Sequence, residues 1–226
     1  MNAFYRSVFV MAAKDIRMEF RRKSLLLSLL VFAILLCVIM DISLDGKRQL
    51  DEGIVSGMLW TTLFFVSAVG LVRSDRFEME HKGWYGLLLA PIDCGAIFYA
   101  KFVSNLLFAW LVDTMVVIVF FFLFDEPLPH SPILFIITMV LGSVGLISIG
   151  TFLAALGMSN PMADLLVPVM LFPLSVPLLI AVTQLTSMAM NGAGFENSTI
   201  WFVLIGGYDL IFLALPFLLF EFIVEV

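Results

Sequence analysis

Two carboxylates stand alone inside apolar sequence and are the first candidates for chemistry. Asp113 and Asp209 each lie near the middle of a long apolar run. A carboxylate at the centre of a membrane helix costs roughly 2.5–3.5 kcal/mol on insertion scales, so it marks a functional site by default. No Lys or Arg follows Phe102 to pair with either acid. They are protonated, hydrogen-bonded to neighbours such as Asn105 or Tyr208, or exposed to a hydrated pathway, and structural and transport roles both stay open.

Motifs of soluble enzymes are missing from the chain. The sequence contains no G-x-x-x-x-G-K-[ST] phosphate loop, no H-E-x-x-H zinc motif and no C-x-x-C pair. We therefore predict no catalytic residue, no metal site and no bound cofactor, and any ATP must be hydrolysed by another chain. Of the two histidines, His130 is a conceivable axial haem ligand, but a solvated loop histidine is the favoured interpretation.

A polar segment from Arg73 to Lys101 separates two of the apolar runs. It holds four cations and four acids, followed by a short apolar patch, Leu87–Ala90, that is too brief to cross a bilayer and is stopped by Pro91. Almost no other soluble mass is present. We expect this segment to be structured at the water interface and to dock a partner.

Long apolar runs must position these residues. The chain is 62% hydrophobic with a mean hydropathy of +1.10, far above the level of soluble domains. Each run covers roughly 25–40 Å as a helix, enough for a hydrocarbon core of about 30 Å. We predict an all-α membrane protein, one domain over residues 1–226, with six transmembrane helices. The runs are Ser24–Met40, Ile54–Val72, Phe102–Phe124, Ile133–Met158, Leu165–Val182 and Ile200–Phe220.

Charge sets the predicted orientation. Ten of the twelve Lys and Arg residues lie before Ser24 or in the polar segment Arg73–Lys101. By the positive-inside rule both regions are cytoplasmic, and six spans return the C-terminus to that side. Nucleic acid is not an expected partner. The external loops are then Asp41–Gly53, Asp125–Pro132 and roughly Thr183–Thr199.

Local patterns refine the elements. Residues 1–23 show helical spacing, with Phe4, Val8, Ala12, Ile16 and Phe20 on one side, and predict an amphipathic helix at the cytoplasmic interface whose cations reach lipid headgroups. The fifth run carries Pro168, Pro173 and Pro177, so it should be kinked or broken; a gating role and a structural one are equally open. Small residues at Gly53 and Gly57 and in the fourth run, at Gly142, Ser143, Gly145, Gly150 and Ala154, predict close helix packing.

Three segments resemble a known family. LLLAPIDCGAIFYAK at Leu87–Lys101, VPVMLFPLSVPLLIA at Val167–Ala181 and YDLIFLALPFLLFEFIVE at Tyr208–Glu225 resemble CcmB, the haem exporter permease of cytochrome c maturation, and the similarity covers nearly the whole chain. One departure is that the acid usual before the leucine run falls on Tyr85, which leaves the coupling details open.

The resemblance implies a set of partners in the bacterial inner membrane. These are an ABC ATPase subunit that binds ATP, a second permease copy and a haem-handling membrane protein, with haem as a possible cargo. It also implies an interfacial helix over residues 1–23 and a coupling helix within 73–101. Pathway or gating roles would fall to Asp113, Asp209, Pro168, Pro173 and Pro177. The coupling residues would be Glu78, Glu80, Tyr85, Leu87, Leu88, Pro91 and Lys101.

Other functions stay open. The same fold could export a lipid, a drug or a polysaccharide, since fold alone does not fix cargo. A third option is a non-transporting assembly factor that releases a haem chaperone; the scarcity of buried polar groups for propionates weakly favours it over free haem passage. A proton-driven carrier is disfavoured because no inverted repeat is evident.

Overall fold

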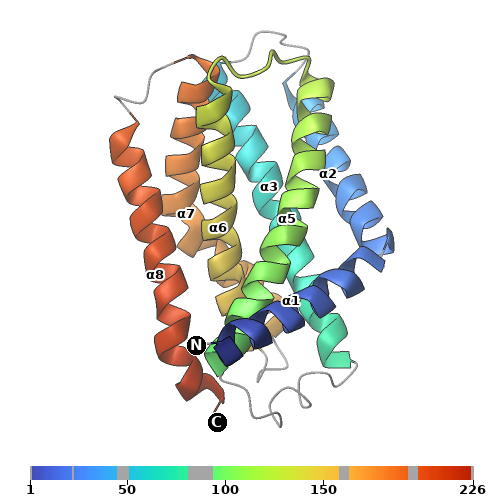
Figure 1. The fold of residues 1–226 in the computed structure, drawn as a ribbon. Helices are drawn as coiled ribbons and strands as arrows, with labels where there is room; N and C mark the ends of the chain where they lie inside the picture. The colour runs from blue at the N-terminus through green and yellow to red at the C-terminus, as the bar shows by residue number, and fades with distance from the viewer. Residues whose placement is uncertain are drawn as a thin grey trace.

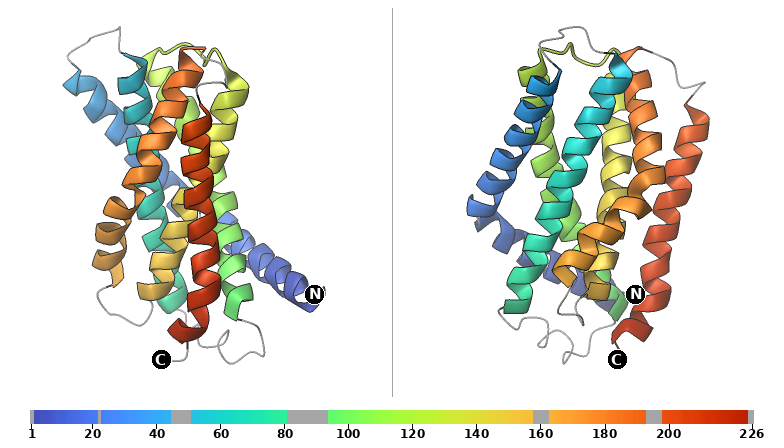
Figure 2. Two further views of the ribbon diagram at one scale, coloured as in Figure 1. Left: turned by 90° about the vertical axis from the view of Figure 1, so that its left-hand side faces the viewer. Right: turned by 180° about the vertical axis from the view of Figure 1, so that it is seen from behind.

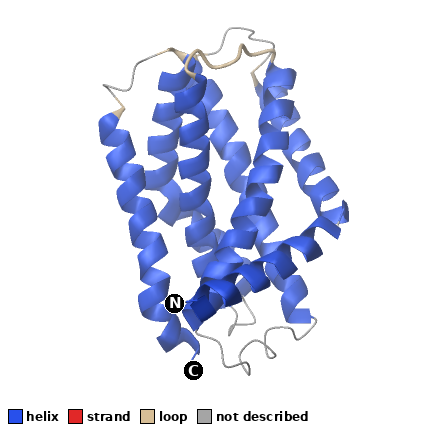
Figure 3. Cartoon of the chain, viewed as in Figure 1, coloured by secondary structure: helices blue, strands red, loops and turns tan. Residues whose placement is uncertain are grey.

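The computed structural model describes residues 2–21, 23–44, 51–80, 94–157, 163–192 and 198–224, and helices joined by short loops make up this part of the chain. Within these ranges no strand occurs, which confirms the all-α prediction (Figure 3). The seven described helices are α1 (Asn2–Arg21), α2 (Lys23–Ser43), α3 (Glu52–Glu80), α5 (Cys94–Phe124), α6 (Pro132–Gly157), α7 (Ala163–Met190) and α8 (Thr199–Val224) (Figure 1).

Six of these helices, α2, α3 and α5 to α8, are long and apolar enough to cross a membrane, as the hydropathy pattern predicts. They run side by side, while α1 lies across one end of the bundle, and both chain termini lie at that end (Figures 1 and 2). A helix satisfies its own backbone hydrogen bonds, so uninterrupted apolar sequence is compatible with lipid only in this form.

Several helix ends differ from the sequence-based boundaries. The prediction started the third span at Phe102, but α5 already begins at Cys94, so the last part of the polar segment continues a membrane helix. Its first part, up to Glu80, likewise extends α3. The prediction ended the fifth span at Val182, and this was wrong because α7 runs to Met190, where Leu185, Thr186 and Ala189 are fully buried. Polar Thr and Gln side chains lower the hydropathy of this stretch, so the hydropathy profile did not show that the helix continues.

Helix α6 lies at the centre and packs against α3, α5, α7 and α8. Its glycines permit this close packing, as predicted: a Cβ at Gly142 would overlap the Trp60 ring, and one at Gly150 would overlap Leu71. The predicted contact at Gly53 is absent, since nothing described lies within 4 Å of a Cβ built there. Close packing therefore concentrates on α6.

Helix α1 packs along α5. Its predicted apolar stripe is partly or fully buried at Phe4, Val8, Ala12 and Ile16, so it covers protein. The acid Glu19 continues this stripe and is only 5% exposed. The exposed residues of α1 include the cations Arg6, Lys14 and Arg17 and the apolar side chains Tyr5, Phe9 and Val10.

Helix α7 contains all three predicted prolines and changes direction along its length (Figure 2). The sequence predicted that this helix is kinked or broken. The structure shows a bend in a helix that stays continuous. Pro173 and Pro177 are exposed on its outer face, and Ser175 between them donates a hydrogen bond back to the carbonyl of Leu171 at 2.6 Å.

The loop between α5 and α6 is tied to the far end of α7. The backbone amide of Ser131 donates to the carbonyl of Ala189 at 3.0 Å, and Nδ1 of His130 lies 2.6 Å from the carbonyl oxygen of Met190. The ring thus bonds a terminal carbonyl of α7, a usual role for histidine at a helix C-terminus. His130 is an exposed loop residue, as the favoured interpretation expected, and the structure adds this hydrogen bond to α7.

Candidate functional site

Asp113 on α5 lines two hollows, a small cavity and a larger groove. The cavity has a volume of about 20 Å³, room for one water molecule. Its polar lining comes from three helices: Glu19 of α1, Ser67 of α3, and Asn105 and Asp113 of α5. The Asn105 amide donates to Oγ1 of Thr151 on α6 at 3.2 Å and not to the acid, contrary to one predicted option. The cavity can hold one water molecule near the carboxyl groups of Glu19 and Asp113.

The groove lies between α5 and α6, and Asp113 also lines it. Its volume is about 390 Å³, and apolar side chains such as Val117, Phe135 and Met139 line most of it. At one edge the indole Nε1 of Trp110 donates to Oγ of Ser143 at 3.0 Å, which links the two helices. Asp113 is partly exposed as a residue, yet its Oδ1 atom is buried and has no hydrogen-bond partner among the described residues.

Asp209 on α8 occupies a different environment. It is 7% exposed, and neither carboxylate oxygen has a hydrogen-bond partner in the described part of the chain. Its Oδ1 lies 2.5 Å from the position that a Cβ on Gly145 of α6 would take, so this glycine makes the room for the carboxyl group. Asp209 lines neither the cavity nor the groove at Asp113. The two acids therefore sit in separate surroundings.

Two tyrosines bond backbone carbonyls near prolines. The hydroxyl of Tyr208 on α8 donates to the carbonyl of Leu174, three residues before Pro177 of α7, at 3.2 Å. The hydroxyl of Tyr99 on α5 donates at 3.1 Å to the carbonyl of Leu213, three residues before Pro216 of α8. A proline ring opens the preceding turn, and these phenols satisfy acceptors there.

Tyr208 therefore does not bond Asp209, which removes one of the options left open for the two acids. Each hydrogen bond joins a proline-containing helix to a neighbour: α5 bonds α8 near Pro216, and α8 bonds α7 near Pro177. Figure 2 shows α7 and α8 as neighbours around the bend.

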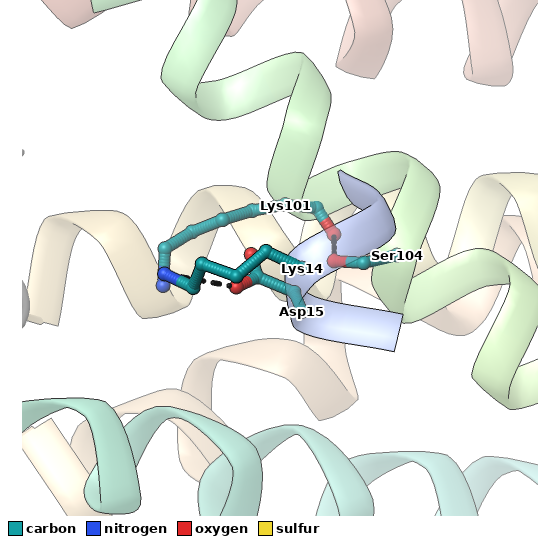
Figure 4. Close-up of polar contacts among 4 residues, drawn as sticks. All are labelled: Lys14, Asp15, Lys101 and Ser104. Atoms are coloured by element: carbon teal, nitrogen blue, oxygen red, sulfur yellow. Dashed lines mark hydrogen bonds and ion pairs between the residues drawn. The ribbon is translucent and has the colours of Figure 1, made fainter. Parts of the chain in front are cut away.

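A polar layer joins α1 to α5 (Figure 4). Lys14 and Asp15 of α1 form an ion pair of 3.3 Å, and the Lys101 side chain extends from α5 toward them. Lys101 is 8% exposed, and the hydroxyl of Ser104 donates to its carbonyl at 2.9 Å. Lys101 was predicted as a coupling residue; in the structure it is buried, and its side chain lies near α1.

Of the other predicted coupling residues, the structure describes two. Glu78 and Glu80 form the last turn of α3. Tyr85, Leu87, Leu88 and Pro91 lie outside the described residues. Of the predicted gating prolines, Pro173 and Pro177 are exposed on α7 and Pro168 is half-buried there. None of the three lines the cavity or the groove.

Sequence reasoning did not single out Glu19 or Tyr99. Glu19 follows Ala12 by seven residues and so continues the apolar stripe of α1, which is a readable signal for a buried acid. Tyr99 gave no such signal, because its partner is a main-chain oxygen more than a hundred residues away. Within the described ranges no group of three His, Cys, Asp or Glu residues could hold a metal ion.

Known proteins resemble the chain along most of its length. The model of the family described as "CcmB protein" matches residues 6–222. The heme exporter protein B of Pseudomonas aeruginosa is 24% identical over 195 residues, which cover 85% of this chain and 86% of the relative. The heme exporter protein B of Rhodobacter capsulatus is 25% identical over 167 residues, covering 74% of this chain and 76% of the relative.

Proposed function

The chain belongs to the CcmB protein family, and from this membership we propose that it is the permease subunit of an ABC transporter that serves haem export for cytochrome c biogenesis. The observation that carries this function is the family match over residues 6–222, supported by two relatives named heme exporter protein B. The six candidate spans fit a multi-pass subunit of the bacterial inner membrane. The chain itself is a transporter subunit and not an enzyme.

The proposed complex contains an ABC ATPase subunit, a second permease copy and a haem-handling membrane protein. ATP would bind to the ATPase subunit, which would dock on the segment 73–101. Two features support this docking place: the segment is rich in charge, and its described ends, the end of α3 and the start of α5, lie at the end of the bundle that holds both termini (Figure 1).

Helix α1 is proposed to lie in the cytoplasmic interface, with both termini in the cytoplasm. Its exposed face supports this placement, because Arg6, Lys14 and Arg17 suit anionic headgroups while Phe9 and Val10 suit acyl chains. Since its other face packs on α5, the helix would transmit movements at the membrane surface to the third span. All these elements belong to one permease domain.

Gene deletion tests the function directly. We expect a deletion strain to lose holo-cytochrome c, seen by haem staining, while immunoblots still detect apocytochrome. A plasmid copy should restore the staining, which is the control. Normal c-type haem staining in the deletion strain would refute the proposed function.

A second candidate is an assembly factor that uses ATP hydrolysis to release a haem chaperone without moving haem through itself. The composition of the later spans favours it, because haem propionates need polar or cationic partners and no Lys or Arg follows Phe102. Vesicles containing the purified complex separate the two functions. ATP-dependent accumulation of haem in the lumen would support export, whereas chaperone release without haem movement would support the assembly role.

A further inference from the structure

The surface groove between α5 and α6 breaks the rule for lipid-facing surfaces. Exposed side chains there are mostly apolar, as lipid requires; Ile118 is 64% exposed and Ile136 is 59% exposed. Asp113 lies among them at mid-helix depth, eleven residues before the end of α5 at Phe124. An ionisable group at that depth is costly unless something pairs with it.

No described residue and no lipid tail supplies that pairing. Oδ1 of Asp113 is buried and has no hydrogen-bond partner among the described residues, while the residue is partly exposed where it lines the groove, and no Lys or Arg follows Phe102 in the sequence. Acyl chains carry no donor at this depth. A second copy of the chain brings no cation either, since its apolar runs contain only Asp113 and Asp209 as charged residues.

We propose that the groove binds a transmembrane helix of a different protein, one that carries a Lys, Arg or His side chain near its middle to pair with Asp113. The volume of about 390 Å³ accepts large side chains, and Val117, Phe135 and Met139 provide the apolar walls. Charge complementarity at Asp113 gives the register, because a buried acid accepts only a partner that brings a donor to the same depth.

The inference is independent of the cargo. It requires neither haem nor the docking of an ATPase, since the groove lies at mid-span between α5 and α6. A groove variant that loses the partner helix but still co-purifies with the ATPase would test this proposal separately from the proposed function.

Site-specific photocrosslinking tests the groove. A photoreactive residue replaces Ile118 in the groove, and a matched probe replaces Val203, which is 69% exposed on α8. In native membranes the Ile118 probe should give a protein adduct, and mass spectrometry should map it to a membrane-spanning peptide with a basic residue. Adducts with lipid alone, or with a peptide lacking such a residue, would overturn the proposal.

Substitutions then test the carboxylate. Asp113→Leu should reduce the Ile118 adduct about tenfold, the worth of a strong interhelical polar contact in a membrane, and leave the Val203 adduct unchanged. Exchange of charges, Asp113→Lys with the mapped basic residue changed to Asp, should restore it.

If Asp113→Leu fails to fold, Val140→Trp fills the groove and leaves the acid in the sequence, and it should abolish the adduct. Co-purification of the ATPase should persist in both variants. An adduct that survives both substitutions would refute the docking site.

Discussion

At the residue scale, Asp209 and Gly145 form one unit across α8 and α6. The carboxylate fills the space that a side chain at position 145 would need, and Leu178 lies 2.9 Å from the same point. Because membrane helices gain stability mainly from close packing, a small residue here sets how near the two helices can come.

Gly145→Ala should therefore destabilise the protein by about 1–3 kcal/mol through overpacking. Thermal unfolding of the purified protein in detergent measures the change. Gly206→Ala is the matched control, because Gly206 is also in a helix and nothing described lies within 4 Å of its added Cβ. Equal melting temperatures for the two variants would contradict the tight contact.

Glu126, just after α5, gives a pH-dependent contribution to stability. Burial raises the pKa of this carboxyl, and the nearby acids Glu52 and Asp125 raise it further. The folded protein then binds more protons than the unfolded chain at pH values between the ordinary and the raised pKa, so stability falls as pH rises through that window.

Glu126→Gln should remove this fall in stability with rising pH, because glutamine carries no titratable group. The variant should melt at a higher temperature than the parent at pH 8, and the difference should shrink toward pH ~4, where the parent is also protonated. Melting curves across this range check the sign. Asp51→Asn is the control, an exposed acid at the same end of the bundle. A gap that widens at low pH would contradict the stated cause.

At the element scale, proline bends and tyrosine bonds act together. Tyr208 holds the carbonyl of Leu174 beside the bend at Pro177, and Tyr99 holds the carbonyl of Leu213 before Pro216. Each bond crosses between helices, so the bend of one helix is fixed by its neighbour. Bent helices with a single external support are candidates for movement when that support changes.

Tyr208→Phe should cost about 0.5–1.5 kcal/mol, the net worth of such a hydrogen bond. In a Pro177→Ala background the cost should be smaller, because loss of the ring lets the turn straighten and the Leu174 carbonyl can then accept from the backbone amide of Leu178. A double-mutant cycle on thermal stability measures this coupling. Tyr5→Phe, at a site 65% exposed, should change nothing, and additive costs for Tyr208 and Pro177 would exclude a joint role.

At the scale of the whole molecule, the described ends of the bundle divide into two sides. The loop after α5 and the end of α7 meet at one side through His130 and Met190, while α1 crosses the other (Figure 1). The positive-inside rule assigns α1 to the cytoplasm, so the loop at His130 should face the periplasm.

Cysteine labelling in intact cells checks this orientation. Leu128→Cys, at a position 81% exposed, should react with a membrane-impermeant maleimide from outside. Lys14→Cys, half exposed on α1, should react only after permeabilisation. Both variants carry Cys94→Ala, and the remaining Cys37 is fully buried. The opposite labelling pattern would invert the topology and place the segment 73–101 outside.

The sequence by itself determined the helical class, the number of candidate spans and the bend in α7. These follow from local physics: long apolar runs must hydrogen-bond internally, and proline removes a donor wherever it lies. The resemblance in three segments also sufficed to identify the family, and the match over residues 6–222 confirms it.

Only the tertiary structure decided the surroundings of the polar side chains. Hydropathy shows that Asp113 and Asp209 are isolated in sequence, but not that Glu19 of α1 reaches the cavity of the first or that Gly145 makes room for the second. Hydrogen-bond donors such as Tyr208 can turn to acceptors on any neighbouring helix, and the main-chain oxygen of Leu174 leaves no trace in a sequence. Which helices pack together decides these contacts, because partners in a helical bundle are distant along the chain.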